Sequence, residues 1–239
     1  MENFDSVLRD VGIKKYKGYA FYFREFIYSN VDFQGKTIAD VGGGNGIASF
    51  YALSADPQCQ CWIVDPIIEG SNLAMMDQYA LMAEKTDATR VHFHKDFIET
   101  LEDPQQFDIV LMHNSINHIG EDIIEEAKSN DGRYLEFIGR LKPIIDRVVQ
   151  GGTIIVSDCG TENFWDKIGL RSPFAPTIEW NLHGEPEFWQ KMLESVGCAH
   201  VKTGWTSRRE LGKLGKLLLA NRFTSYFTTR HFVSVYKKV

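Results

Sequence analysis

The sequence predicts an α/β fold in which a largely parallel β-sheet is covered by helices on both faces. Short apolar, β-branched runs alternate along the chain with longer segments whose apolar residues recur at helical spacing. The runs predict strands at residues 37–41, 61–65, 90–94, 107–113 and 151–158. The segments between them predict helices at residues 47–55, 71–85 and 132–150. Because alternating strands and helices form right-handed βαβ units, the helices should lie on both faces of the sheet.

Both ends of the chain depart from this alternation. Residues 1–33 contain a dense aromatic segment, which we expect to form an N-terminal helical cap that docks an apolar stripe on the sheet. The last part of the chain predicts a helix at 185–197, a strand at 199–206, a basic helix at 208–222 and a strand at 231–239. No Pro- or Ser-rich linker divides the chain, so we expect one domain over residues 1–239.

Composition excludes general disorder and sets the expected compartment. The chain has 239 residues, of which 44% are hydrophobic, enough to bury a sizeable core. The sequence shows neither a secretory leader nor an apolar run long enough to span a bilayer, so we expect a cytoplasmic protein with no stable membrane insertion. The four cysteines lack the spacing of a zinc site and are interpreted as reduced thiols, and no metal is expected.

Charge is distributed unevenly along the chain. The net charge is −6, but residues 1–199 carry 17 basic and 31 acidic side chains, whereas residues 200–239 carry nine basic side chains and one acid, Glu210. Such a basic segment is typical of a solvated face, which we favour, but also of an anionic substrate, a dimer contact or a peripheral membrane surface. The acidic body argues against a nucleic-acid partner.

The strongest local motif is the glycine-rich turn after the first predicted strand. Asp40 and Val41 lead into Gly-Gly-Gly-Asn-Gly at 42–46, and the next predicted helix begins there. Glycines allow a ligand to approach the backbone, and a helix N-terminus offers free N–H donors. Asp65 ends the second predicted strand, where a carboxylate can accept both hydroxyls of a ribose. A tight βα turn without a ligand is the alternative.

The D-x-G-x-G-x-G order resembles motif I of the class I S-adenosylmethionine (SAM)-dependent methyltransferases. Dinucleotide-binding folds instead space their glycines as G-x-G-x-x-G. The resemblance extends over roughly residues 35–239 and includes FHKDF (93–97), FDIVLMHNSINHI (107–119) and the final strand–helix–strand unit. It implies a three-layer sandwich with a seven-stranded, mostly parallel sheet and an antiparallel last strand.

The same resemblance implies where SAM would bind. Contacts to the ribose and adenine are expected from acidic and apolar residues after the second and third strands, and contacts to the methionyl group from the glycine turn. The expected cofactor residues are Asp40, Gly42, Gly43, Gly44, Asp65, Pro66, Asp96, Phe97, His113 and Asn114, with Tyr19 and Arg24 from the cap.

Catalysis is assigned to the loop after the fourth strand. Methyl transfer mainly needs orientation and desolvation, but a hydroxyl or protonated amine must lose a proton, and a neutral histidine can take it. His118 is the predicted general base, and a structural histidine is the alternative. Residues 159–184 are the expected substrate-pocket insertion. The predicted acceptor-binding residues are Asn117, His118, Trp165, Trp180 and His183.

The sequence therefore predicts a SAM-dependent methyltransferase that acts on an oxygen or nitrogen of a small molecule and releases S-adenosylhomocysteine. Four alternatives stay open: a SAM-binding protein that does not transfer methyl groups, a protein methyltransferase, a nucleic-acid methyltransferase, and a NAD(P)-dependent oxidoreductase. The sequence is also compatible with a homodimer.

Overall fold

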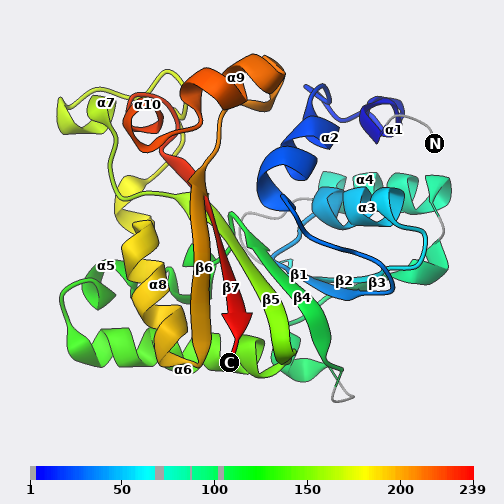
Figure 1. Cartoon of the computed structure of the whole chain (residues 1–239), viewed down its shortest axis with the longest axis horizontal. Helices are drawn as coiled ribbons and strands as arrows, with labels where there is room; N and C mark the ends of the chain where they lie inside the picture. Colours follow the sequence, from blue (N-terminus) through cyan, green and yellow to red (C-terminus); the bar gives the residue numbers. More distant parts are fainter. Residues whose placement is uncertain (1–3, 68–72, 87, 102–104) are drawn as a thin grey trace.

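The fold is a three-layer α/β sandwich built on one seven-stranded sheet, seen in a computed structural model of the chain (Figure 1). The structure describes residues 4–67, 73–86, 88–101 and 105–239. The strand order is β3-β2-β1-β4-β5-β7-β6. The strands are β1 (Thr37–Val41), β2 (Gln60–Val64), β3 (Val91–His94), β4 (Phe107–His113), β5 (Val148–Cys159), β6 (Cys198–Trp205) and β7 (His231–Lys238).

Strand direction confirms the predicted sheet. The strands β1 to β5 pair in parallel, whereas β7 lies antiparallel between β5 and β6. The order reverses at β1, because β2 pairs on one side of it and β4 on the other. In open α/β sheets this reversal creates a crevice at the carboxyl ends of the strands, where ligands bind.

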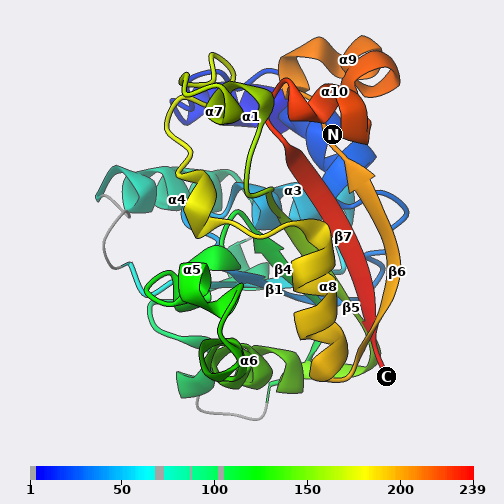
Figure 2. The ribbon, with the colours of Figure 1, turned by 90° about the vertical axis from the view of Figure 1, so that its left-hand side faces the viewer.

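Helices cover both faces of the sheet, as the two views show (Figures 1 and 2). One layer contains α1 (Phe4–Asp10), α2 (Tyr19–Tyr22), the π-helix η1 (Phe23–Ile27), α3 (Ile47–Ala55) and α4 (Leu73–Lys85). The other contains α5 (Ile124–Ala127), α6 (Asp131–Asp146) and α8 (Pro186–Ser195). The chain also forms α7 (Phe164–Lys167), α9 (Gly212–Leu219) and α10 (Arg222–Tyr226), and the short helices η2 (Ala88–Arg90), η3 (Ile98–Thr100), η4 (Asn117–Gly120), η5 (Trp180–Leu182) and η6 (Arg209–Leu211).

Two hydrophobic cores fill the spaces between these layers. Phe137 and Trp189 are fully buried in the core that contains α6 and α8. Phe23 and Phe50 are buried in the core that contains the cap and α3. The aromatic stripe of the cap therefore docks against the sheet, as predicted from its spacing.

Three predicted helices have different bounds in the structure. The helix expected at 132–150 ends at Asp146, because Val148 and Val149 begin the long strand β5. The basic helix expected at 208–222 is divided into η6, α9 and the start of α10. The aromatic segment is a short α-helix followed by a π-helical turn. Of the helix expected at 71–85, residues 71 and 72 lie outside the described residues, and α4 covers the rest.

Across the residues that the structure describes, the helices are either too short or too polar to cross a bilayer.

Candidate active site

The glycine turn joins β1 to α3 at the point where the strand order reverses. Gly42 has φ of +69° and Gly44 has φ of +55°, a region that side chains with a Cβ rarely occupy. A Cβ on Gly42 would also lie only 2.5 Å from the Cβ of Ser115. The Ser115 hydroxyl donates to the Val41 carbonyl at 2.5 Å, so it ties the glycine turn to the loop after β4.

Asp65 lies just beyond β2 and faces the glycine turn. Its Oδ2 accepts the Gly44 backbone N–H at 2.8 Å, and its Oδ1 accepts the Ile67 N–H at 2.9 Å. The residue is 8% exposed. A side-chain-free turn beside a carboxylate at the end of the second strand fits a nucleoside cofactor. Pro66 follows directly, before residues 68–72, which lie outside the described part of the chain.

Asp40 lies beneath the glycine turn. It is 1% exposed, and its Oδ2 accepts the Ser49 hydroxyl at 2.8 Å from α3. A Cβ on Gly43 would lie 2.7 Å from its carboxyl carbon, so the turn rests on this side chain. Burial raises the pKa of Asp40 to about 6, and the hydrogen bonds from Ser49 oppose that rise.

Asp40→Asn should therefore change the pH dependence of folding. Because the pKa is raised in the folded state, this group makes the chain less stable as pH rises from the unfolded value of 3.8 to about 6. The neutral Asn side chain does not titrate, so the variant keeps its stability over this range. Above pH 7 its free energy of unfolding should exceed that of the parent by up to about 3 kcal/mol. Urea unfolding at pH 4 and pH 8 measures the difference. An equal effect at both pH values would contradict the assignment.

Three more of the predicted cofactor residues have exposed side chains. Asp96 is exposed after β3, where its Oδ1 accepts the Phe97 N–H at 2.8 Å, and the Phe97 side chain is 54% exposed. Arg24 is exposed and forms an ion pair with Glu25 at 2.8 Å. Cofactor contacts by these three residues stay predictions.

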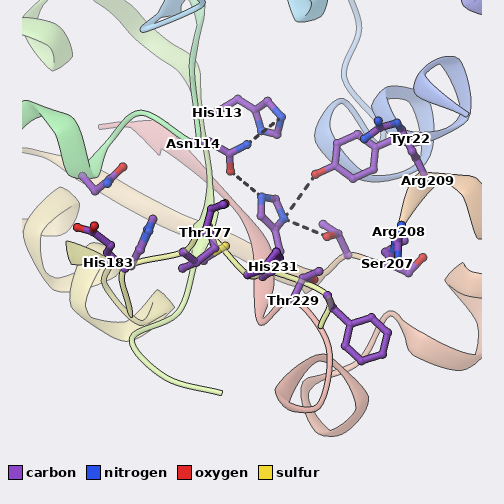
Figure 3. Close-up of a pocket in the computed structure, with 18 of the residues that line it drawn as sticks. Tyr22, His113, Asn114, Thr177, His183, Ser207, Arg208, Arg209, Thr229 and His231 are labelled. Carbon is purple, nitrogen blue, oxygen red and sulfur yellow. Dashed lines mark hydrogen bonds between the residues drawn. The ribbon is translucent and has the colours of Figure 1, made fainter. Parts of the chain in front are cut away.

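A cavity of about 790 Å³ lies on the other side of the end of β4 (Figure 3). Its wall includes Tyr19, Tyr22, His113 and Asn114, so two predicted cofactor residues at the end of β4 separate it from the glycine turn. Of the predicted acceptor residues, Asn117, His118 and His183 line the cavity.

Trp165 and Trp180 are not part of this wall. Trp165 donates its indole N–H to the Phe227 carbonyl at 3.0 Å, and Trp180 is buried with 8% exposure. The insertion instead contributes Phe174–Glu179 and Leu182 to the wall. That the insertion binds an acceptor stays a prediction, and the two tryptophans lie outside the wall of this cavity.

His231 on β7 occupies the centre of a polar network in the cavity wall (Figure 3). Burial lowers the pKa of His231 to about 3, so the ring is neutral. Its Nε2 lies 2.8 Å from Asn114 Oδ1 and therefore carries the proton, while its Nδ1 accepts the Thr206 hydroxyl at 3.0 Å. The Tyr22 hydroxyl lies 3.5 Å from the same Nδ1. Sequence analysis missed this residue, because a lone histidine in an apolar strand is most often a core residue.

Two further histidines in the wall are each paired with a carboxylate. His183 Nδ1 lies 2.8 Å from Oδ1 of Asp158, a fully buried residue at the end of β5. Burial raises the pKa of Asp158, and the His183 hydrogen bond opposes that rise. His118 Nδ1 is paired with Glu121, and its side chain is 60% exposed. In both pairs the bond fixes the ring and leaves Nε2 as the second nitrogen.

Several buried polar atoms in the wall have no hydrogen-bond partner within the described ranges. They are His113 Nδ1, Asn117 Oδ1 and Ser207 Oγ. Burial lowers the pKa of His113 to about 4, so this ring is also neutral. Buried polar groups are normally hydrogen-bonded, so these atoms are exceptions beside the cavity.

Comparisons with solved structures identify the fold class. The pyocyanin biosynthetic protein PhzM is 18% identical, with a TM-score of 0.53, and the match covers 92% of this chain and 54% of that one. An O-methyltransferase family 2 protein from Planctomyces limnophilus, solved with apigenin, is 14% identical, with a TM-score of 0.55 and coverages of 99% and 60%. A candidate SAM-dependent methyltransferase from Listeria monocytogenes is 15% identical, with a TM-score of 0.57 and coverages of 87% and 92%.

The chain therefore has the fold of the class I SAM-dependent methyltransferases, the family that its sequence resembles. It spans little more than half the length of the first two solved structures. No family model and no curated protein sequence matches it.

Proposed function

We propose that the chain is a SAM-dependent methyltransferase whose acceptor is a small molecule, methylated on oxygen or nitrogen. The observation that carries the proposal is the cavity at the end of β4, which adjoins the glycine turn through Asn114 and Ser115. Methyltransferases need a cofactor site and an acceptor site that meet, and in this proposal both lie at the carboxyl ends of the parallel strands.

In this proposal the residues around the glycine turn hold the cofactor. Asp65 accepts the ribose hydroxyls, the bare backbone at Gly42–Gly44 leaves room for the methionyl group, and the buried Asp40 supports the turn. SAM, when bound, supplies a methyl group on a cationic sulfonium. His113 and Asn114 border both regions, and the neutral His113 ring adds no competing positive charge beside a cationic cofactor.

The cavity residues hold the acceptor and move its proton. His118 accepts the proton from the acceptor, and Glu121 orients the ring and stabilises its charged form. His183, fixed by the buried Asp158 carboxylate, contacts the acceptor from the β5 side. Asn117 and Ser207 supply further polar contacts, while Tyr19, Phe174 and Leu182 supply apolar surface.

The walls of the cavity favour a small acceptor over a macromolecule. A volume near 790 Å³ falls within the usual range for small-molecule sites, and the cap and the insertion both contribute to the wall. The name of the Planctomyces protein, an O-methyltransferase solved with apigenin, supports an oxygen acceptor as the first choice.

Calorimetry with SAM and with NADH tests the proposal directly. We expect a saturable heat of SAM binding and none with NADH at the same concentrations. The glycines of the turn are spaced G-x-G-x-G, whereas a pyrophosphate-binding turn has G-x-G-x-x-G. Release of S-adenosylhomocysteine is then measured by mass spectrometry with a panel of phenols, hydroxy acids and amines. Binding of NADH instead of SAM would overturn the assignment, and SAM binding with no turnover across the panel would favour the non-transferring alternative.

A further inference from the structure

Large apolar side chains are exposed at one end of the molecule. In the described part of the chain, 13 such side chains are exposed, and five of them fall within residues 211–223. The most exposed of these five are Leu217 at 79%, Phe223 at 74% and Leu214 at 65%. Isolated exposed leucines are ordinary, but a contiguous group marks an interaction surface.

The packing of α9 explains why its leucines face outward. Gly215 is the buried residue of this helix, and a Cβ there would lie 2.6 Å from the Leu211 Cβ and 2.9 Å from the Ser207 Oγ. The glycine side of α9 therefore packs against the body, which leaves Leu214 and Leu217 exposed. A surface helix that only covered the core would have the opposite arrangement.

The region beside α9 extends this apolar surface. Phe223 lies in the first turn of α10, and Phe227, directly after this helix, packs against Phe164 of α7 with ring centroids 5.0 Å apart. Ile168 and Leu170, just after α7, are 51% and 55% exposed. Both views show α7, α9 and α10 at the same end of the molecule, opposite α6 (Figures 1 and 2).

The charges on α9 and α10 are all positive. The two helices carry Lys213, Lys216 and Arg222 and no acidic residue. Lys216 contacts Glu25 at 2.8 Å and Arg222 contacts Glu187 at 3.4 Å, but both pairs are exposed and add little. The rest of the chain is acidic, so this end stands out by charge as well as by apolarity.

We propose that the α9–α10 face, formed by Leu214, Leu217, Leu218 and Phe223 with Lys213 and Arg222, docks on an anionic lipid surface. Leucine and phenylalanine side chains enter the headgroup region, while lysine and arginine pair with anionic headgroups. A second copy fits less well, because a two-fold contact through this face would bring like charges together. The adjoining cavity, whose wall contains Arg208 and Phe174, would then lie beside the lipid surface.

Vesicle sedimentation tests this proposal without any knowledge of the cofactor or acceptor. The full chain is mixed with vesicles of phosphatidylcholine alone, or of phosphatidylcholine with about one third phosphatidylglycerol, a composition chosen so that headgroup charge attracts basic side chains. We expect binding to the anionic vesicles that weakens as NaCl is raised, and much weaker binding to the neutral ones.

The matched variants are Leu217→Glu and Leu135→Glu. Leu135 on α6 is 64% exposed at the opposite end of the molecule, so both changes put the same charge on an exposed leucine. Leu217→Glu should weaken binding by roughly tenfold or more, because it places an acid in the docking face, whereas Leu135→Glu should not. Equal melting temperatures establish that both variants are folded.

Three outcomes would overturn the proposal. The parent chain could stay in the supernatant with anionic vesicles, or the two variants could bind equally well. Light scattering could instead show a dimer that Leu217→Glu dissociates, which would mean that a second copy of the chain, and not a lipid surface, covers this face. Loss of SAM binding in calorimetry bears only on the proposed methyl transfer, so the two proposals fail separately.

Discussion

Asp65→Ala is expected to lower SAM affinity by about 100-fold or more. A ribose would lose a charged acceptor for its two hydroxyls, and each such hydrogen bond contributes about 1.5–3 kcal/mol. The change also removes the acceptor of the Gly44 and Ile67 N–H groups at 2.8 and 2.9 Å, so the glycine turn loses its link to the end of β2. Calorimetric titration with SAM measures the loss.

Two further variants separate the ribose contact from a general defect. Asp65→Asn keeps the shape and one carbonyl oxygen, so its affinity should lie between those of the parent and the alanine variant. Asp77→Ala removes an exposed carboxylate from α4 and should leave affinity unchanged. Parent-like affinity in Asp65→Ala would contradict the cofactor site. If only Asp77→Ala weakened binding, charge rather than the ribose contact would be responsible.

Most of the sheet and the glycine turn could be predicted from sequence, because local chemistry determines them. Thr37–Val41 and Phe107–His113 are apolar, β-branched runs, and the structure gives both the predicted bounds. The turn after β1 needs positive φ at Gly42 and Gly44, which few other residues adopt at low cost. The predicted end of the helix now labelled α6 was wrong. Val148 and Val149 fit the apolar spacing of a helix as well as that of a strand, and pairing with β4 makes them part of β5.

The predicted site was incomplete wherever it depends on contacts between distant segments. His231 meets Asn114 only because β7 inserts between β5 and β6, and no spacing in the sequence encodes that neighbour. Arg209 likewise reaches the cap through the fold, with its guanidinium 4.1 Å from the Tyr19 ring centroid. Asp158, which pairs with His183, is not among the site residues predicted from sequence. Its burial beside the insertion becomes visible in three dimensions alone.

The second large effect is expected at His118, whose replacement by alanine should lower turnover by about 100-fold or more while SAM affinity is retained. The reason is chemical: a hydroxyl acceptor loses its proton as the new bond forms, and alanine cannot take it. The measurement is S-adenosylhomocysteine release with an acceptor identified in the panel. Turnover equal to that of the parent would remove His118 from the mechanism.

His183→Ala is the matched comparison, because both histidines line one cavity and each is held by a carboxylate. If His183 anchors the acceptor, its loss should raise KM more than it lowers kcat. The reverse pattern, with kcat lowered in His183→Ala and mainly KM raised in His118→Ala, would move the base to the Asp158–His183 pair. That exchange is chemically reasonable, since a buried carboxylate stabilises an imidazolium more strongly than the exposed Glu121 can. The division of the loss between kcat and KM therefore decides which of the two pairs holds the base.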